Sequence, residues 1–302
     1  MRPRTQRAAW IQLVARIAAA WMGFAAALLL GALMWGHIVP SEGQLAFITQ
    51  GDVRQEIRII DLQTRIIYPL VSLIDLDQIA GSSSGALALT IRHGENSRIA
   101  VVDLQSRNMH QPIYNSRFDT NPAWSPDGRW LAFQSSDADG ADIYVADLNG
   151  NNLRQLTHDP GFDGDPTWSP DSQQIAFRSS RSGSTDLYVM DAQGDNIRRL
   201  TDNQAWEEHP VWSPDGRYIA FAAYVSTNWD LYLLEVATGE IRQLTDSAAR
   251  DHYPTWSPDG TKIAFESNRD GQVGIYLLDL DRRDLTFVIK GFHSSYFPNE
   301  RP

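Results

Sequence analysis

PVWSPDGRYIAF, residues 210–221, places a tight turn between a large aromatic residue and a short apolar run. Pro214 restricts φ to the value that such a turn needs, and Gly216 accepts a positive φ. The residues from Tyr218 to Phe221 are apolar enough to form a strand. By itself the stretch predicts a β-hairpin, so its meaning depends on whether it recurs.

The same pattern recurs along the chain. Trp-Ser-Pro-Asp begins at four positions that are 44 residues apart: Trp124, Trp168, Trp212 and Trp256. Each copy continues with a strand of the type Ile-Ala-Phe and then with a second strand that contains Tyr. Two weaker copies, within residues 45–61 and 87–103, keep this register. Six repeats therefore extend from about residue 45 to about residue 290.

Four short strands in each repeat are typical of a propeller blade. The sequence therefore predicts an all-β fold, a six-bladed β-propeller of four-stranded antiparallel blades over residues 40–302. Each repeated Trp is expected to pack between adjacent blades. A strand near residues 294–297 is predicted to close the ring as the inner strand of the first blade, with residues 38–40 as the alternative. The acids of the repeated turns are expected to be structural: Asp127, Asp171, Asp215 and Asp259.

The N-terminus has a different composition. Residues 1–16 carry four arginines and no acid, and residues 17–39 carry no charged residue. A run of this length can cross a bilayer as a helix, and basic residues favour the cytoplasmic side. We expect one uncleaved transmembrane helix over residues 17–39, with the propeller outside the cytoplasm of a bacterial-type cell, in the periplasm or at the cell surface. A cleaved signal peptide is the alternative, and small residues at a spacing of four leave contact with a partner transmembrane helix open.

The repeats resemble those of TolB-type β-propellers. The resemblance rests on Trp-Ser-Pro-Asp-Gly followed by Ile-Ala-Phe, on Ser-x-Arg-x-Gly elements at residues 179–183 and 267–271, and on the Ile/Leu-Tyr strand; the four strong copies span residues 119–290. It implies a propeller fold and a scaffold that binds protein or peptide partners. Similar blades also occur in propeller domains fused to serine peptidases, so the resemblance does not by itself fix the function.

The composition narrows the classes of partner and chemistry. The net charge is −11, and the absence of cysteine removes disulfides and thiolate chemistry. An acidic body repels phosphates, which argues against a nucleic-acid partner and is compatible with a basic protein or peptide.

Two short patterns suggest chemistry but are interpreted as structural. Gly81-Ser-Ser-Ser-Gly85 matches a G-x-S-x-G nucleophile pattern, but a strand rather than a helix is predicted after it. Asp137-x-Asp139-Gly140-x-Asp142 suggests calcium, but Asp142 has equivalents in other repeats, which points to a role in a turn. We therefore predict no catalytic residue and no resident cofactor, with Ca²⁺ left open.

The candidate partner-binding surface lies just upstream of each repeated Trp. An acid stands five residues before each one: Asp119, Asp163, Glu207 and Asp251. Pseudo-rotation would gather these acids at the mouth of the central channel, where they could hold a cation or the basic end of a peptide. Alternatively, each acid only caps its own turn. The other candidates are Asp165, Trp206, Glu208, His209, Trp229, His252 and Tyr253.

The sequence thus favours a non-catalytic, membrane-anchored propeller that docks a protein or peptide, as a scaffold or an accessory subunit of an envelope complex. The alternative is a cation-dependent, lactonase-like propeller hydrolase that acts at the channel mouth.

Overall fold

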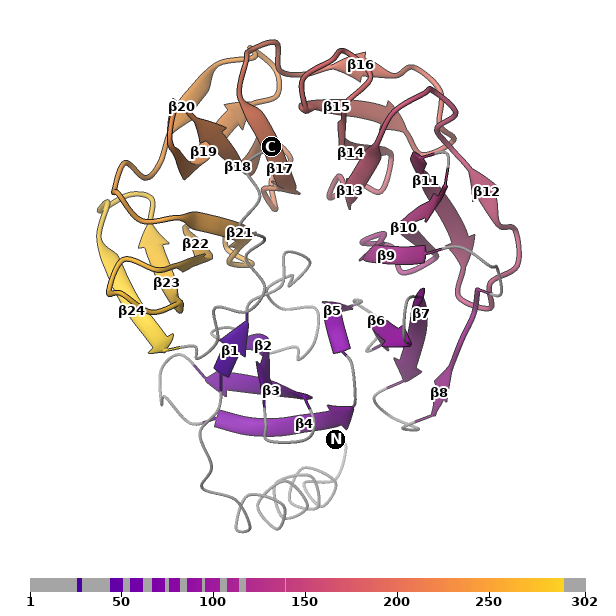
Figure 1. The fold of residues 1–302 in the computed structure, drawn as a ribbon, viewed down its shortest axis with the longest axis horizontal. Helices are drawn as coiled ribbons and strands as arrows, with labels where there is room; N and C mark the ends of the chain where they lie inside the picture. The colour runs from indigo at the N-terminus through magenta and orange to yellow at the C-terminus, as the bar shows by residue number, and fades with distance from the viewer. Residues whose placement is uncertain are drawn as a thin grey trace, which may run out of the picture.

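In the computed structural model, six four-stranded antiparallel sheets follow one another along the chain, and in each sheet the strands pair in sequence order (Figure 1). The structure describes residues 26–28, 44–50, 55–61, 67–73, 76–81, 86–93, 96–103, 108–113, 118–138 and 140–290. The first sheet contains β1 (Ala26–Leu28), β2 (Gln44–Gln50), β3 (Gln55–Asp61) and β4 (Ile67–Leu73). The second contains β5 (Leu76–Gly81), β6 (Ala86–His93), β7 (Asn96–Asp103) and β8 (Met109–His110). The third contains β9 (Phe118–Trp124), β10 (Trp130–Asp137), β11 (Gly140–Asp147) and β12 (Arg154–Gln155). The fourth contains β13 (Asp163–Trp168), β14 (Gln174–Ser179), β15 (Asp186–Asp191) and β16 (Arg198–Arg199). The fifth contains β17 (Trp206–Trp212), β18 (Tyr218–Val225), β19 (Asn228–Glu235) and β20 (Ile241–Gln243). The sixth contains β21 (Asp251–Trp256), β22 (Lys262–Ser267), β23 (Gly274–Asp279) and β24 (Leu285–Lys290).

The core lies between neighbouring sheets. In the four strong copies the Phe of the Ile/Leu-Ala-Phe strand is fully buried, and among the described residues these are the largest fully buried side chains: Phe133, Phe177, Phe221 and Phe265. Each one packs against the Tyr of the next strand in its own sheet, with ring centroids 5.8–6.1 Å apart. The second strand is apolar on both faces because each face meets a sheet, which explains its uninterrupted apolar run.

The repeated Trp residues lie between sheets. Trp168 Nε1 donates a hydrogen bond to Ala123 O (3.1 Å) in the preceding sheet, and Trp256 Nε1 donates to Val211 O (3.1 Å) in the same way. Trp124 Nε1 donates to Ala80 O at 3.2 Å. Each of these three indoles therefore joins two sheets through both apolar packing and one directed bond.

The Ser-Pro-Asp segment forms the same hydrogen-bonded turn in all four copies, with Ser172 in place of the glycine in one of them. In the copy quoted above, Ser213 Oγ donates to Asp215 Oδ1 (2.6 Å), and Gly216 N donates to Ser213 O (2.9 Å). Gly216 has φ +72°, a left-handed conformation that costs a non-glycine residue free energy. Because the paired strands are antiparallel, these turns lie on one face of the ring, which we call the turn face, and the loops that lead into the inner strands lie on the opposite face, which we call the mouth face.

Five of the six sheets pack as propeller blades. Four hydrophobic clusters connect neighbouring sheets in an unbroken series from β5–β8 to β21–β24. The remaining sheet, β1–β4, contacts β21–β24 through β1, and no comparable packing joins it to β5–β8 within the described ranges. The prediction of six blades is therefore corrected to five packed blades plus one further sheet.

The predicted transmembrane helix over residues 17–39 is also wrong. Ala26–Leu28, inside that segment, forms strand β1 and pairs with β2 from Ala26↔Gln50 to Leu28↔Ile48. In the described ranges, no helix has the length and apolar character needed to cross a membrane. An uncharged segment rich in small and apolar residues is compatible with an edge strand of a sheet as well as with a membrane-spanning helix. Composition alone therefore did not distinguish the two. The predicted closing strand near residues 294–297 and its alternative at 38–40 lie outside the described residues.

Candidate functional site

Four inner strands, β9, β13, β17 and β21, each carry one residue in the left-handed backbone conformation, always at the third position before the repeated Trp. These residues are Asn121, Asp165, His209 and Tyr253, with φ between +51° and +53°. Asn, Asp and His tolerate this conformation better than most side chains, whereas Tyr rarely adopts it. Backbone strain of this kind is concentrated at functional sites, so its recurrence at one position in four strands identifies a candidate site.

A β-bulge produces this conformation. In β13, Gly164 pairs with Arg178 and Thr167 pairs with Ala176, so two residues of the inner strand oppose one residue of β14. The same shift occurs in β9, β17 and β21. Proline follows the strained residue every time and has no N–H for the ladder. A bulge redirects a side chain, and here it brings residues of adjacent blades together.

The redirected side chains form a chain of contacts across four blades. Asn121 Nδ2 donates to a carboxylate oxygen of Asp165. The other carboxylate oxygen accepts a hydrogen bond from His209 N (3.1 Å) and lies 3.2 Å from His209 Nδ1. The His209 ring packs on the Tyr253 ring, with centroids 4.2 Å apart. We call these four residues, together with Arg178, Glu208 and His252, the mouth cluster.

Arg178 is the cation of the mouth cluster. Its Nε lies 3.0 Å from Asp165 Oδ2, its Nη1 pairs with Glu208 Oε1, and its guanidinium lies over the Phe162 ring at 4.6 Å. Burial opposes ionisation of Asp165, but Arg178 and His209 outweigh it and hold the pKa of this carboxyl well below its usual range. The pair is therefore charged at every physiological pH and fixes the geometry around it.

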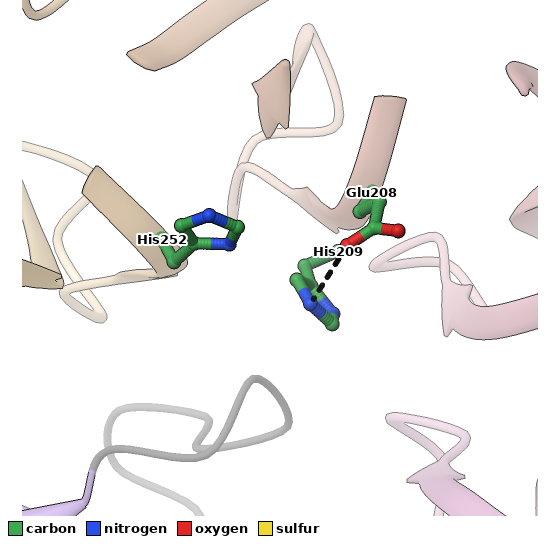
Figure 2. A group of neighbouring side chains, drawn as sticks. All are labelled: Glu208, His209 and His252. Atoms are coloured by element: carbon green, nitrogen blue, oxygen red, sulfur yellow. Dashed lines mark ion pairs between the residues drawn. The ribbon is translucent and has the colours of Figure 1, made fainter. Parts of the chain in front are cut away.

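His252 lies on the other side of the mouth cluster. Its ring is 4.4 Å from the buried Trp229 ring and 6.2 Å from the His209 ring. Burial, followed by the charges of His209 and Arg250, lowers the pKa of His252 well below its ordinary value, so this imidazole is neutral. Figure 2 shows Glu208, His209 and His252 grouped, and one ligand atom from each lies within 4.8 Å of the other two.

The four predicted mouth acids are placed differently from the mouth cluster. Each is almost fully buried, and Asp119, Asp163 and Asp251 are bound inside their own blades. Asp163 pairs with Arg181 (2.9 Å), and Asp251 accepts two bonds from Arg269 Nη2 (2.9 and 3.0 Å). Asp119 accepts a hydrogen bond from Ser135 Oγ at 2.7 Å. These contacts give the acids a structural role in each blade, and cation binding at them stays a prediction.

Glu207, the fourth of these acids, has donor groups but no cation beside it. Asn203 Nδ2 donates to it at 2.6 Å, and the Thr201 hydroxyl also donates to it. Burial raises the pKa of Glu207 to about 7, although these donors favour the charged form. This side chain changes its charge near neutral pH.

The remaining predicted residues divide by exposure. Trp206 is 40% exposed on the mouth face, as is Phe118 (41%) at the equivalent position of another blade. Trp229 is buried, stacks on His252 and packs against Tyr224, so it does not form an exposed contact surface. The structure thus brings together Asp165, Glu208, His209, His252 and Tyr253, and places Trp206 at the start of the inner strand β17.

The two patterns interpreted as structural keep that interpretation where the structure describes them. Asp142 accepts hydrogen bonds from Gln155 and Thr157 of its own blade. Asp139 and residues 82–85 lie outside the described residues, and strand β6 begins at Ala86.

Sequence reasoning missed Asn121 and Arg178. Arg178 follows Ile-Ala-Phe in its repeat, and the equivalent positions hold Gln134, Ala222 and Glu266. A position that varies in charge inside an otherwise uniform buried strand is the signal that would have found it. Asn121 shares its repeat position with Asp165 and His209, and that alignment alone would have included it.

Comparisons with known proteins agree with this architecture. The family model described as the TolB beta propeller domain matches residues 82–224 and 202–297. No curated protein matches the sequence.

Among solved structures, TolB from Acinetobacter baumannii is 21% identical with a TM-score of 0.73; the match covers 83% of this chain and 64% of that one. A putative TolB from Agrobacterium tumefaciens is 24% identical with a TM-score of 0.70, covering 80% of this chain and 90% of that one. Oligogalacturonate lyase in complex with manganese is 15% identical with a TM-score of 0.64, covering 89% and 79%. These structural likenesses show the fold, and the chain spans about two thirds of the length of the first of them.

Proposed function

The chain belongs to the TolB beta propeller domain family, and on that premise we propose that it is a non-catalytic platform that docks a protein or peptide on its mouth face. The observation that carries the proposal is the mouth cluster, in which one anion–cation–anion series and two aromatic rings from adjacent blades meet at the bulges of the inner strands. One fold supports many functions, so the proposed function depends on this site and not on the architecture.

The mouth cluster is preorganised. Arg178 and Asp165 are held by several partners each, and the strained backbone at His209 and Tyr253 is fixed by the bulges around it. A site whose side chains are already ordered loses little conformational entropy when a partner binds. Polar groups with fixed directions at the centre of a surface give a docked peptide its register and specificity.

Exposed aromatic residues surround this centre. Trp206 and Phe118 each start an inner strand and are about two-fifths exposed on the mouth face. Trp is strongly enriched among residues that dominate binding free energy, because it buries a large rigid surface. The partner proposed here therefore presents an apolar anchor for this rim and a basic group for the acidic chain of net charge −11.

The proposed location is outside the cytoplasm. Four arginines precede the uncharged residues 17–39, and this order is typical of segments that direct export. A fusion of the C-terminus to alkaline phosphatase, which folds only after export, would be active if this is right. A fusion to a reporter that works only in the cytoplasm is the matched control, and activity of that reporter alone would contradict the location.

Selection of random linear peptides displayed on phage tests the docking proposal. We expect peptides that bind the wild type and lose binding to a Trp206→Ser/Tyr253→Asn double variant, since Asn tolerates the left-handed backbone at position 253. Ile241→Ser is the matched control, because Ile241 is 38% exposed on an outer strand away from the mouth cluster.

Peptides that bind the double variant and the wild type equally would contradict docking at the mouth face. Failure to select any peptide would contradict peptide docking as such. The lactonase-like enzyme predicted as the alternative is not tested by the fold, since similar folds include a lyase as well as TolB.

A further inference from the structure

Three potential metal ligands converge within the mouth cluster. They are Glu208 and His209 of β17 and His252 of β21, and one ligand atom from each lies within 4.8 Å of the others (Figure 2). Glu208 Oε2 lies 3.7 Å from His209 Nε2. One ion with bonds of about 2.0–2.2 Å can contact two atoms at this separation, and an inward rotation of the His252 side chain would complete the set.

His209 is oriented as metal-bound histidines are. Its Nδ1 lies 3.2 Å from Asp165 Oδ2, within reach of an Nδ1–H hydrogen bond to the carboxylate. In the neutral tautomer this bond leaves the lone pair on Nε2, the nitrogen that faces Glu208. A carboxylate behind the histidine fixes the tautomer and makes the ligand nitrogen more basic, and such pairs accompany most histidine metal sites.

The two carboxylate oxygens of Glu208 have different neighbours. Arg178 pairs with Oε1 and leaves Oε2 directed at His209. Asp165 and Glu208 carry two negative charges against the one positive charge of Arg178, so this group keeps one net negative charge. A bound cation would be attracted by that charge without displacing the Arg178 ion pairs.

The ligand types select the class of ion. Two imidazoles and one carboxylate suit borderline divalent transition metals, with Zn²⁺ as a strong example, and leave a fourth position for water or a partner group. Ca²⁺ prefers six to eight oxygen ligands and has no such set here. The geometry points to a site for a divalent transition-metal ion bound by Glu208, His209 and His252, with Asp165 as a positioning residue.

This site is distinct from the four mouth acids at which a cation was predicted from the sequence. Asp119, Asp163 and Asp251 are bound inside their own blades and Glu207 by Thr201 and Asn203, whereas the three ligands of this site come from adjacent inner strands. Metal binding and peptide docking can also be separated by experiment, because the metal test needs no partner.

Zn²⁺ titration by calorimetry tests the site, with protein whose affinity tag has been removed because tags containing histidine bind Zn²⁺. We expect wild-type protein to bind one Zn²⁺ and to bind Ca²⁺ far more weakly. His209→Ala and Glu208→Gln should lose this binding, and both should keep the wild-type circular dichroism spectrum. His158→Ala, at an exposed histidine in another blade, is the matched control and should bind as the wild type does.

Asp165→Asn distinguishes positioning from ligation. It should weaken Zn²⁺ binding by about 10- to 100-fold but leave the absorption spectrum of the Co²⁺-loaded protein typical of the same three ligands. The proposal is overturned if wild-type protein binds Zn²⁺ no more tightly than Ca²⁺, or if both ligand variants bind Zn²⁺ as the wild type does. A Co²⁺ spectrum unchanged by His209→Ala would also overturn it.

Discussion

Replacing Arg269 with Met should destabilise the protein strongly, because Arg269 is the cation that pairs with the buried Asp251 of the same blade. Arg269 Nη2 donates to both carboxylate oxygens of Asp251, at 2.9 and 3.0 Å, and the Asp251 side chain is 0% exposed. Met keeps most of the apolar stem but removes the cation. The variant therefore leaves a buried carboxylate without its counter-charge.

The expected loss in the free energy of unfolding is about 3–5 kcal/mol, the usual cost of removing one partner of a buried ion pair. Loss of the guanidinium over the Phe265 ring (5.2 Å) and the Tyr276 ring (4.9 Å) adds to it by roughly 0.5–1 kcal/mol. Urea unfolding followed by circular dichroism measures the difference. Adding Asp251→Asn to the variant should recover part of the loss, since the double variant no longer buries a charge.

Arg282→Met is the control, because the Arg282 side chain is exposed at a turn, and it should change stability by no more than about 0.5 kcal/mol. A loss below about 1 kcal/mol for Arg269→Met would refute the view that Asp251 is held structurally by its own blade. A variant whose stability is restored by millimolar Ca²⁺ would instead support cation binding by the mouth acids.

Three further predictions concern the blades. Burial raises the pKa of Glu207 to about 7 from an ordinary 4.5. Its contribution to stability is therefore full below pH 4.5 and is lost as the pH rises through 7. Between pH 4.5 and pH 8 the free energy of unfolding of the wild type, measured in urea, should fall by about 3 kcal/mol relative to that of Glu207→Gln. Gly216→Ala should cost about 1 kcal/mol, because φ +72° disfavours alanine although the added methyl group has room; a neutral effect on the melting temperature would contradict this. Trp256→Phe should destabilise by about 1 kcal/mol more than Trp212→Phe, because Trp256 Nε1 donates to Val211 O whereas Trp212 Nε1 has no hydrogen-bond partner in the described structure; equal losses would contradict it.

Much of the fold was predictable because the repeat carries it in local chemistry. Pro214 and Gly216 define the turn, Phe221 defines the buried second strand, and the period of 44 residues defines the blade. The number of packed blades was not predictable in the same way. The weaker first copy kept the spacing of a blade, but spacing does not establish packing between sheets, and the uncharged segment at 17–39 was compatible with both a helix and a strand.

The candidate site was only partly predictable. Asp165, Glu208, His209, His252 and Tyr253 were selected because they stand near repeated acids, but the acids themselves are bound by other partners. What separates the two groups is the bulge, since it redirects the residue before each proline toward the adjacent blade. A bulge depends on how two strands pair, so residues on one strand do not reveal it. Trp229 illustrates the same limit, because it lacks an aromatic equivalent in other repeats and yet is buried against His252.

Docking on the mouth face is the central claim, and site-specific photo-crosslinking in the source cells tests it most directly. A photo-reactive amino acid would replace Trp206 on the mouth face in one variant and Arg217, exposed on the turn face, in another. The account predicts a discrete cross-linked product from position 206 and none from position 217. Cross-links from position 217 alone, or the same products from both positions, would contradict it.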